Sequence, residues 1–203
     1  MQGKDWLVSK NGEYQNCKSV RAWDLITENY RLYRFLTELE DILRKELDEN
    51  DYLAKIRQLV RRLLVNSYWV RSQHPEPNSK SGTSVKLLYD ELGFPFTVQT
   101  VTFTPGIQSN IHNHGTWGIV AILKGKEKNT IWKRNPTAEY PDKIETAGEL
   151  VLTPGDIISF APGAIHSVEA VSDEPTVTFN LYGETTSKER FEFDTVHHTA
   201  KNF

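Results

Sequence analysis

Residues 105–118 read Pro-Gly-Ile-Gln-Ser-Asn-Ile-His-Asn-His-Gly-Thr-Trp-Gly, and they contain a His-x-His pair, His112 and His114. On a β-strand, residues two positions apart point to the same face. We therefore expect both imidazoles to project into one cavity. Further along, residues 155–166 combine an apolar run and a Pro-Gly turn with a third histidine, His166. Two histidines from one strand and a third from another form a candidate metal site.

The sequence around these histidines has the pattern of antiparallel β-structure. From Ser84 onwards, short apolar runs alternate with turns that contain glycine or proline. Many short strands at this spacing predict a sandwich or barrel. The expected strands are residues 85–89, 97–103, 111–124, 129–133, 150–153, 156–160, 166–171 and 176–182. The tail from residue 185 to 203 is polar.

The N-terminal region is predicted to contain two helices. Residues 1–18 show no clear period and are interpreted as a loosely packed arm. From about Ser19, a candidate N-cap, to Glu49, apolar residues recur at helical spacing. They are Leu25, Leu32, Phe35, Leu36, Leu39, Leu43 and Leu47.

A second helix is expected from Asp51, its candidate cap, to about Val70. Its apolar residues lie on one side, and Arg57, Arg61 and Arg62 lie on or beside the other, where they form either a solvated charged face or an anion-binding face. Residues 71–83 are rich in turn formers and are interpreted as a linker.

Length, charge and cysteine content limit the class of protein. The 203 residues suit a division into residues 1–83 (arm, helical segment and linker) and residues 84–203 (barrel and tail). A net charge of -3 gives no basic surface, so we expect no nucleic-acid partner. The single cysteine, Cys17, excludes an intramolecular disulfide, and no apolar run resembles a signal peptide or a membrane span. We expect a soluble cytoplasmic monomer or homodimer without a membrane partner.

The histidine pattern resembles the cupin family of double-stranded β-helix jelly rolls. In cupins, a first motif places a glutamate three or four residues after HxH, and a second motif combines glycine, a PxG-type turn and histidine. His112, His114 and His166 match the three histidines, whereas Gly118 or Ile119 stands in the place of the glutamate. The resemblance implies a mainly β fold, a jelly-roll barrel preceded by an N-terminal helical pair.

A three-histidine set without the glutamate is similar to the thiol dioxygenases, cysteine dioxygenase and 3-mercaptopropionate dioxygenase, over about residues 84–182. The run from His112 to Gly125 is especially similar to the bacterial branch of that family. The resemblance implies that Fe(II) is bound by the three histidines, and that both atoms of O2 are transferred to the sulfur of a small carboxylate-bearing thiol, giving a sulfinate. Imidazole ligands also suit zinc, copper or nickel, so the spacing alone does not choose the ion.

The same resemblance implies further site residues. Lys86 stands where the family has an arginine that binds the substrate carboxylate, although a surface lysine is an equally good interpretation. Thr178, Asn180 and Tyr182 stand in place of a Ser-x-His-x-Tyr run, and strand alternation puts them on one face. The phenol of Tyr182 is expected near the substrate, and Asn180 can orient it but has no titratable group.

Trp117 and Gly118 are candidates for the substrate pocket, but alternation favours core packing for Trp117. Two other functions stay open, a metal-dependent cupin of different chemistry and a non-catalytic cupin that binds a metal or small molecule. Lys86 and Asn180 favour these alternatives because they depart from the family pattern. The complete histidine set and Tyr182 favour an enzyme.

Overall fold

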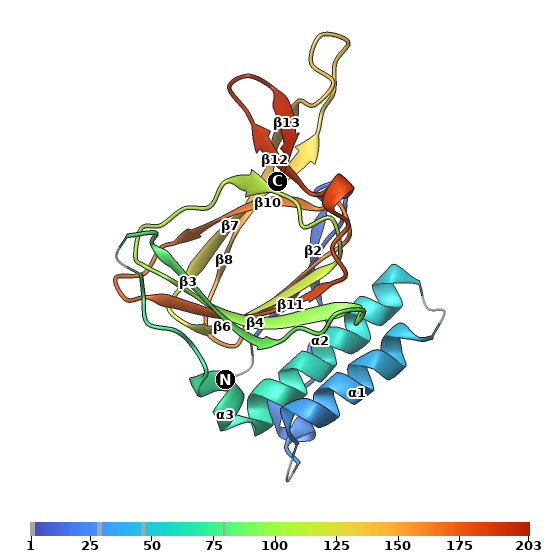
Figure 1. Ribbon diagram of the computed structural model, residues 1–203, viewed down its shortest axis with the longest axis vertical. Coiled ribbons are helices and arrows are strands. Elements are labelled where there is room, and N and C mark those ends of the chain that lie inside the picture. The colour runs from blue at the N-terminus through green and yellow to red at the C-terminus, as the bar shows by residue number, and fades with distance from the viewer. Residues whose placement is uncertain (1–2, 28–29, 46–47, 79) are drawn as a thin grey trace.

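The computed structural model of the protein describes residues 3–27, 30–45, 48–78 and 80–203, so Leu47 of the predicted helical pattern lies outside the described residues. Two sheets face each other and close into a barrel, and the helices pack outside one of them (Figure 1). We name the seven-stranded sheet, which contacts the helices, sheet A. Its strands, in spatial order, are β2 (Tyr14–Cys17), β1 (Asp5–Val8), β9 (Ile157–Phe160), β6 (Gly118–Lys124), β11 (Thr176–Gly183), β4 (Phe96–Phe103) and β3 (Thr83–Tyr89).

The facing six-stranded sheet is named sheet B. Its strands, in spatial order, are β13 (Thr199–Asn202), β12 (Phe191–Asp194), β5 (Ile111–His112), β10 (Ile165–Ala170), β7 (Glu127–Arg134) and β8 (Ile144–Leu152). From β4 to β12 the chain passes back and forth between the sheets, apart from the β7–β8 hairpin. In the part of the chain that the structure describes, the strand pairs are antiparallel except β1 with β9. This is a jelly-roll barrel with N-terminal helices, as predicted.

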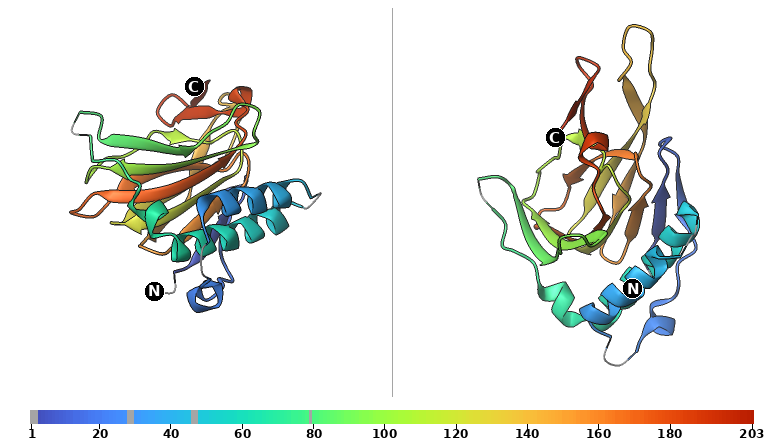
Figure 2. Two further views of the ribbon diagram at one scale, coloured as in Figure 1. Left: turned by 60° about the horizontal axis from the view of Figure 1, so that its bottom comes forward. Right: turned by 45° about the vertical axis from the view of Figure 1, so that its right-hand side comes forward.

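Both ends of the chain contribute strands that the sequence did not predict. The interpretation of residues 1–18 as a loosely packed arm is wrong, because β1 pairs with β9 and β2 pairs with β1. The buried side chains of Leu7 and Val8 explain the attachment of β1. The polar tail forms the β12–β13 hairpin, which extends beyond the barrel beside the β7–β8 hairpin (Figure 2).

The helices begin and end at other residues than expected. The first region contains a short 3-10 helix, η1 (Ala22–Leu25), and α1 (Leu32–Leu43); Ser19 caps neither, because its hydroxyl donates to the Gly3 carbonyl. The second region contains α2 (Glu49–Asn66) and α3 (Tyr68–Ser72). Asp48 caps α2 by accepting a hydrogen bond from the Asp51 backbone, so the cap precedes the predicted one.

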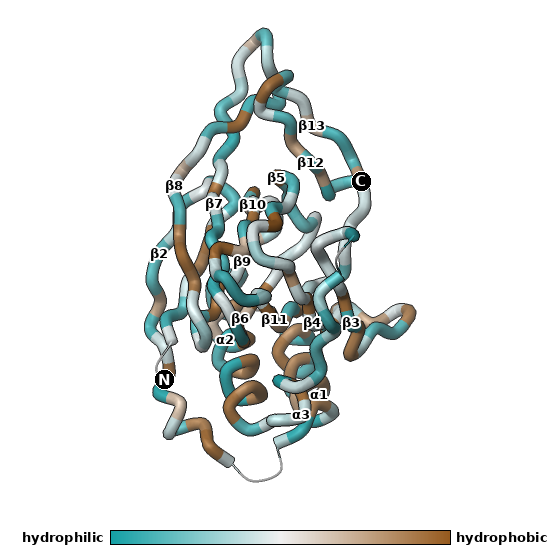
Figure 3. Tube along the Cα trace, turned by 90° about the vertical axis from the view of Figure 1, so that its left-hand side faces the viewer, coloured by the Kyte–Doolittle hydropathy of each residue, from teal (hydrophilic) through white to brown (hydrophobic). Residues whose placement is uncertain are grey.

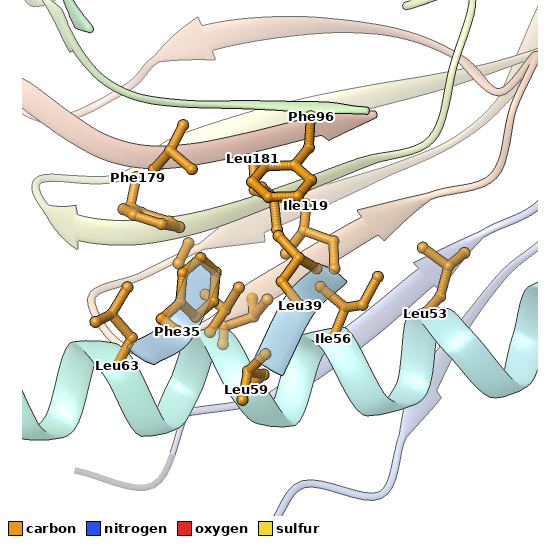
Figure 4. Close-up of a cluster of buried hydrophobic side chains, with 14 of the residues drawn as sticks. Phe35, Leu39, Leu53, Ile56, Leu59, Leu63, Phe96, Ile119, Phe179 and Leu181 are labelled. Atoms are coloured by element: carbon orange, nitrogen blue, oxygen red, sulfur yellow. The ribbon is translucent and has the colours of Figure 1, made fainter. Parts of the chain in front are cut away.

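The main core lies between sheet A and the antiparallel pair of α1 and α2 (Figure 4). Phe35 of α1 contacts Phe179 of β11 edge-on, with ring centroids 6.3 Å apart. Each fully buried side chain of this kind contributes about 1.5–3 kcal/mol. The buried residues shared by the two layers include Phe35, Leu39, Leu53, Ile56, Leu63, Phe96, Ile119, Phe179 and Leu181. Since Phe179 and Leu181 face the helices, the alternate residues of β11 face the barrel interior.

Arg57 and Arg61 do not form a solvated face or a free anion site. Both are buried where α2 crosses sheet A. Arg61 pairs with Asp5 and donates to the Gly155 carbonyl at 2.9 Å, while Arg57 donates to the Ser159 hydroxyl at 2.6 Å. They connect the helix to the barrel strands β1 and β9.

Hydropathy along the chain fits this arrangement. In Figure 3, α2 alternates between hydrophobic and hydrophilic residues, as expected of a helix with one buried side. Among the described residues, no helix has both the length and the apolar character that crossing a bilayer requires.

Candidate metal centre

The three histidines come from two strands and the connection that follows one of them. His112 ends β5 and is the direct cross-strand partner of His166 on β10. His114 lies beyond β5, where the chain crosses from sheet B to sheet A and Gly115 takes a φ of 64°. The prediction of one continuous strand at 111–124 is therefore wrong. Its two halves, β5 and β6, belong to opposite sheets.

The imidazoles nevertheless converge on one point. One ring nitrogen from each lies within 4.8 Å of those of the other two, and the Nε2 atoms of His114 and His166 are 3.1 Å apart. Metal–imidazole bonds of about 2.0–2.1 Å place neighbouring ligand nitrogens about 3 Å apart. The spacing of these nitrogens fits a shared metal ion.

Hydrogen bonds orient two of the rings for this role. Nδ1 of His112 is 2.9 Å from the Asn110 carbonyl oxygen, and Nδ1 of His166 is 3.0 Å from Oδ1 of Asn129. Because both oxygens only accept, each ring carries its proton on Nδ1 and leaves Nε2 free for a metal.

Burial keeps the three imidazoles neutral. It holds the pKa of His114 and of His166 well below the usual range, and the nearby His112 lowers both further. Burial also lowers the pKa of His112. Neutral imidazole is the form that binds a metal, so the three histidines can bind one at neutral pH without first losing a proton.

The surroundings of Gly118 explain why this position has no glutamate side chain. A Cβ at this position would lie 2.9 Å from Nδ1 of His114 and 3.1 Å from ring carbons of Tyr182. The neighbouring Ile119 faces the helices and is fully buried there. The rings of His114 and Tyr182 therefore fill the space that a side chain at 118 would need.

The close approach at Gly118 leads to a first prediction. We expect Gly118→Ala to displace the His114 ring and weaken Co(II) binding by about 10–100-fold, the range seen when the support of a ligand is disturbed. Chelator competition measures the dissociation constant. Gly93→Ala is the control, since its methyl group would meet nothing within 4 Å. The φ of 82° at Gly93 adds backbone strain that Gly118 does not share, so the control also covers a general loss of stability. Equal Co(II) affinity in Gly118→Ala and the unsubstituted protein would contradict the packing argument.

Thr178, Asn180 and Tyr182 lie in a row on the inner face of β11. The Tyr182 hydroxyl donates to Oδ1 of Asn180 at 3.2 Å, and Nδ2 of Asn180 donates to the Thr178 hydroxyl at 2.8 Å. The Tyr182 ring packs nearly perpendicular to that of His114, with centroids 4.6 Å apart. Burial raises the pKa of Tyr182, so its phenol stays protonated at neutral pH.

A cavity of about 320 Å³ opens beside the histidines. Its volume is at the lower end of the range for small-molecule sites. Polar side chains dominate its lining, which consists of Thr97, Gln99, His112, His114, Tyr182, Thr185 and Arg190.

Arg190 is the cation of this cavity, and the sequence did not point to it. Its guanidinium carbon lies 4.1 Å from the centroid of the Phe203 ring. Its Nε is buried without a hydrogen-bond partner, and no carboxylate of the described residues forms an ion pair with it. Arg190 therefore retains its capacity to bind an anion.

Asn113, the residue between the two histidines, holds Arg190 in place. Its amide donates to the Glu189 carbonyl at 2.9 Å and accepts from the Phe191 backbone at 2.7 Å. Strand β12 then continues from Phe191 along β5. The alternating Phe-Glu-Phe-Asp run at 191–194 is the sequence signal that could have predicted this strand.

Lys86 lies outside the cavity. Its cross-strand partner is Thr100, and both side chains contact Gln73, with Nζ of Lys86 2.7 Å from Oε1 of Gln73. Lys86 thus points to the outer face of the barrel, which corrects its prediction as a cavity residue. The number of residues between Lys86 and His112 matched the family spacing, but β3 turns the side chain of Lys86 away from the cavity.

Trp117 also lies away from the cavity. Its ring is buried among the residues that contact the helices, 6.1 Å from the ring of Tyr52. This corrects its prediction as a pocket residue and agrees with the core packing that alternation favoured. Gly118, in contrast, lies at the site, against the rings of His114 and Tyr182.

Comparisons with known proteins found similar solved structures at low sequence identity. No family model matches the chain. A solved structure of oxalate oxidase in complex with glycolate matches with 17% identity and a TM-score of 0.42, over 56% of this chain and 57% of that one. A cupin superfamily protein from Desulfitobacterium hafniense matches with 11% identity and a TM-score of 0.40, over 53% and 82% of the two chains.

A third match is the cupin domain of a transcriptional regulator from Enterobacter cloacae, with 18% identity and a TM-score of 0.39, over 52% of this chain and 99% of that one. The chain thus spans little more than half the length of the oxalate oxidase chain. The fold assignment given above rests on strand order and register, and the metal centre rests on the geometry of the histidines.

Glu127, at the start of β7, has a buried carboxyl. Burial raises the pKa of Glu127 to about 7. Because the unfolded chain releases this proton near pH 4.5, the stability contributed by Glu127 is lost as pH rises from about 4.5 to about 7. A shift of this size corresponds to about 3 kcal/mol.

Glu127→Gln should remove this pH dependence. In metal-free protein, we expect the free energy of unfolding of the variant to gain about 3 kcal/mol relative to the unsubstituted protein between pH 5 and pH 9. Urea unfolding at several pH values measures the difference. A difference that stays constant over this range would show that Glu127 ionises normally.

Proposed function

We propose that the protein is an iron(II)-dependent thiol dioxygenase of the cupin type, which oxidises a small carboxylate-bearing thiol to its sulfinate. The observation that carries the proposal is a set of three neutral imidazoles beside a cavity that contains Arg190. Among the described residues, no carboxylate joins the histidine set and none pairs with Arg190. In the reaction, R–SH and O2 give R–SO2H. Sulfur is oxidised, O2 is reduced by the same number of electrons, and no further reductant is needed.

The charge of the ligand set favours a thiol substrate. His112, His114 and His166 are neutral donors, so they would leave the ion with its full double positive charge. A coordinated thiol is deprotonated by such an ion, and the iron supplies the redox chemistry with O2 when it is bound. An anionic sulfur is thus preferred over a neutral ligand.

The cavity provides a partner for the other end of the substrate. Arg190 has a planar fork of donors that matches a carboxylate, and the cavity of about 320 Å³ suits a short molecule. Tyr182, fixed by Asn180, offers a phenol beside His114. We assign this phenol to hydrogen bonding with the bound substrate, since the amide of Asn180 is not titratable and cannot relay a proton at neutral pH.

Oxygen uptake by iron-loaded protein tests the proposal. The panel is cysteine, 3-mercaptopropionate, and cysteamine, which has the thiol but no carboxylate. We expect thiol-dependent uptake with at least one carboxylate-bearing thiol, and a much weaker rate with cysteamine. Absence of uptake across the panel would contradict the proposal.

Asn180 favours one alternative, a metal-dependent cupin of other chemistry with zinc or nickel as the ion. An amide in this position orients the phenol without acid–base function. Protein purified without chelators and analysed for metal content distinguishes the cases. Zinc or nickel in place of iron, together with no thiol oxidation after iron loading, would favour the alternative.

A further inference from the structure

Three buried polar side chains form a hydrogen-bonded row inside the barrel that ends at a metal-site histidine. Nδ2 of Asn129 donates to Oε1 of Glu127 at 2.8 Å, and Nδ1 of His166 lies 3.0 Å from Oδ1 of Asn129. Glu127 is 3% exposed, Asn129 is fully buried and His166 is 3% exposed. Glu127 is not among the residues that line the cavity.

The row follows from strand alternation. On β7, Glu127, Asn129 and Ile131 share the inner face, and Ile131 is the cross-strand partner of His166. The intervening Lys128 points outward, where it pairs with Glu169. The amide of Asn129 therefore lies diagonally from His166, within reach of its Nδ1.

A carboxyl in this place calls for an explanation. No lysine, arginine or histidine in the described parts of the chain forms an ion pair with Glu127. Burying a carboxylate without a cation is costly, and an apolar residue would serve barrel packing at lower cost. Among the described residues, the carboxyl of Glu127 has a single hydrogen-bond partner, the side-chain amide of Asn129.

The direction of the hydrogen bonds supplies that explanation. An ionised carboxylate only accepts, so the amide of Asn129 must turn its NH2 group toward Glu127. Its oxygen then faces His166, which must carry its proton on Nδ1. We propose that Glu127 is a positioning residue that, through Asn129, fixes the tautomer of His166 and so presents the free Nε2 to the metal.

The proposal rests on the metal centre of the proposed function, but its first test needs no metal. NMR of 15N-labelled, metal-free protein at pH 8 reports the tautomer of His166, assigned by the loss of its signals in His166→Gln. We expect the Nδ1–H tautomer in the unsubstituted protein. Glu127→Leu removes the acceptor and should give a mixture of His166 tautomers. Glu127→Gln permits both orientations of the Asn129 amide, so its fraction of the Nδ1–H tautomer should lie between those of Glu127→Leu and the unsubstituted protein.

Co(II) titration by chelator competition gives the second measurement. We expect Glu127→Leu to weaken Co(II) binding by about tenfold, the lower end of effects seen for supports of metal ligands, with a smaller loss in Glu127→Gln. Thr102→Val is the matched control, because Thr102 is a buried hydroxyl that donates to the Pro75 carbonyl away from the site. It should change neither measurement.

The outcomes separate this proposal from the proposed function. An unchanged His166 tautomer in folded Glu127→Leu, with Co(II) affinity within about twofold of the unsubstituted protein, would overturn the role of Glu127. Failure of the unsubstituted protein to bind Co(II) would contradict the metal centre instead, and the tautomer measurement would still decide the role of Glu127.

Discussion

His166→Ala is expected to abolish both metal binding and thiol-dependent oxygen uptake. Only two imidazoles would remain, and the Oδ1 atom of Asn129 would lose its buried hydrogen-bond partner. Metal analysis after anaerobic iron loading and desalting measures the stoichiometry. We expect one iron per chain in the unsubstituted protein and less than about a tenth of that in the variant, since loss of a ligand costs more than the 10–100-fold seen for outer residues.

A surface histidine provides the control for this experiment. His197→Ala removes an exposed imidazole that pairs with Asp194 outside the cavity. It should keep full iron content and full activity. Retained iron in His166→Ala, with the stoichiometry of the control, would contradict the three-histidine centre.

Arg190→Gln is expected to raise KM for 3-mercaptopropionate by about 10–100-fold, with a smaller effect on kcat. Hydrogen bonds to a charged group are worth about 1.5–3 kcal/mol, and the variant loses the carboxylate's partner. Steady-state oxygen uptake separates the two constants. Arg190→Lys should recover part of the loss, because lysine restores the charge without the planar fork.

Lys86 offers the matched comparison for Arg190. Its side chain contacts Gln73 on the outer face of the barrel, so Lys86→Gln should leave KM within about twofold, as is usual for a surface substitution. A large rise in KM for Lys86→Gln, with none for Arg190→Gln, would reverse the assignment of the carboxylate partner.

The sequence predicted the barrel and the histidine set because both depend on local patterns. His112, His114 and His166 lie in short motifs whose turns fix where the side chains point. The three imidazoles converge on one point even though the predicted strand at 111–124 divides between two sheets. Likewise, strand alternation predicts that Thr178, Asn180 and Tyr182 share one face of their strand, and their side chains form one hydrogen-bonded row in the structure.

The remaining features depend on contacts between distant parts of the chain. Arg190 reaches the cavity because Asn113 binds the backbone on either side of it, at Glu189 and Phe191. No local pattern indicates such a link. Spacing along the chain suggested Lys86, but the face that β3 presents is set by its register with β4. The ion pair of Asp5 with Arg61 similarly joins segments that the sequence interpretation treated separately.

The most direct test of the proposed function is the fate of 18O2 in iron-loaded protein supplied with the best thiol of the panel. Mass spectrometry of the product, together with oxygen and thiol consumption, gives the stoichiometry. We predict one O2 consumed per thiol and a sulfinate that carries both labelled atoms. A product limited to disulfide, or a sulfinate with one labelled atom or none, would contradict a thiol dioxygenase at this three-histidine centre.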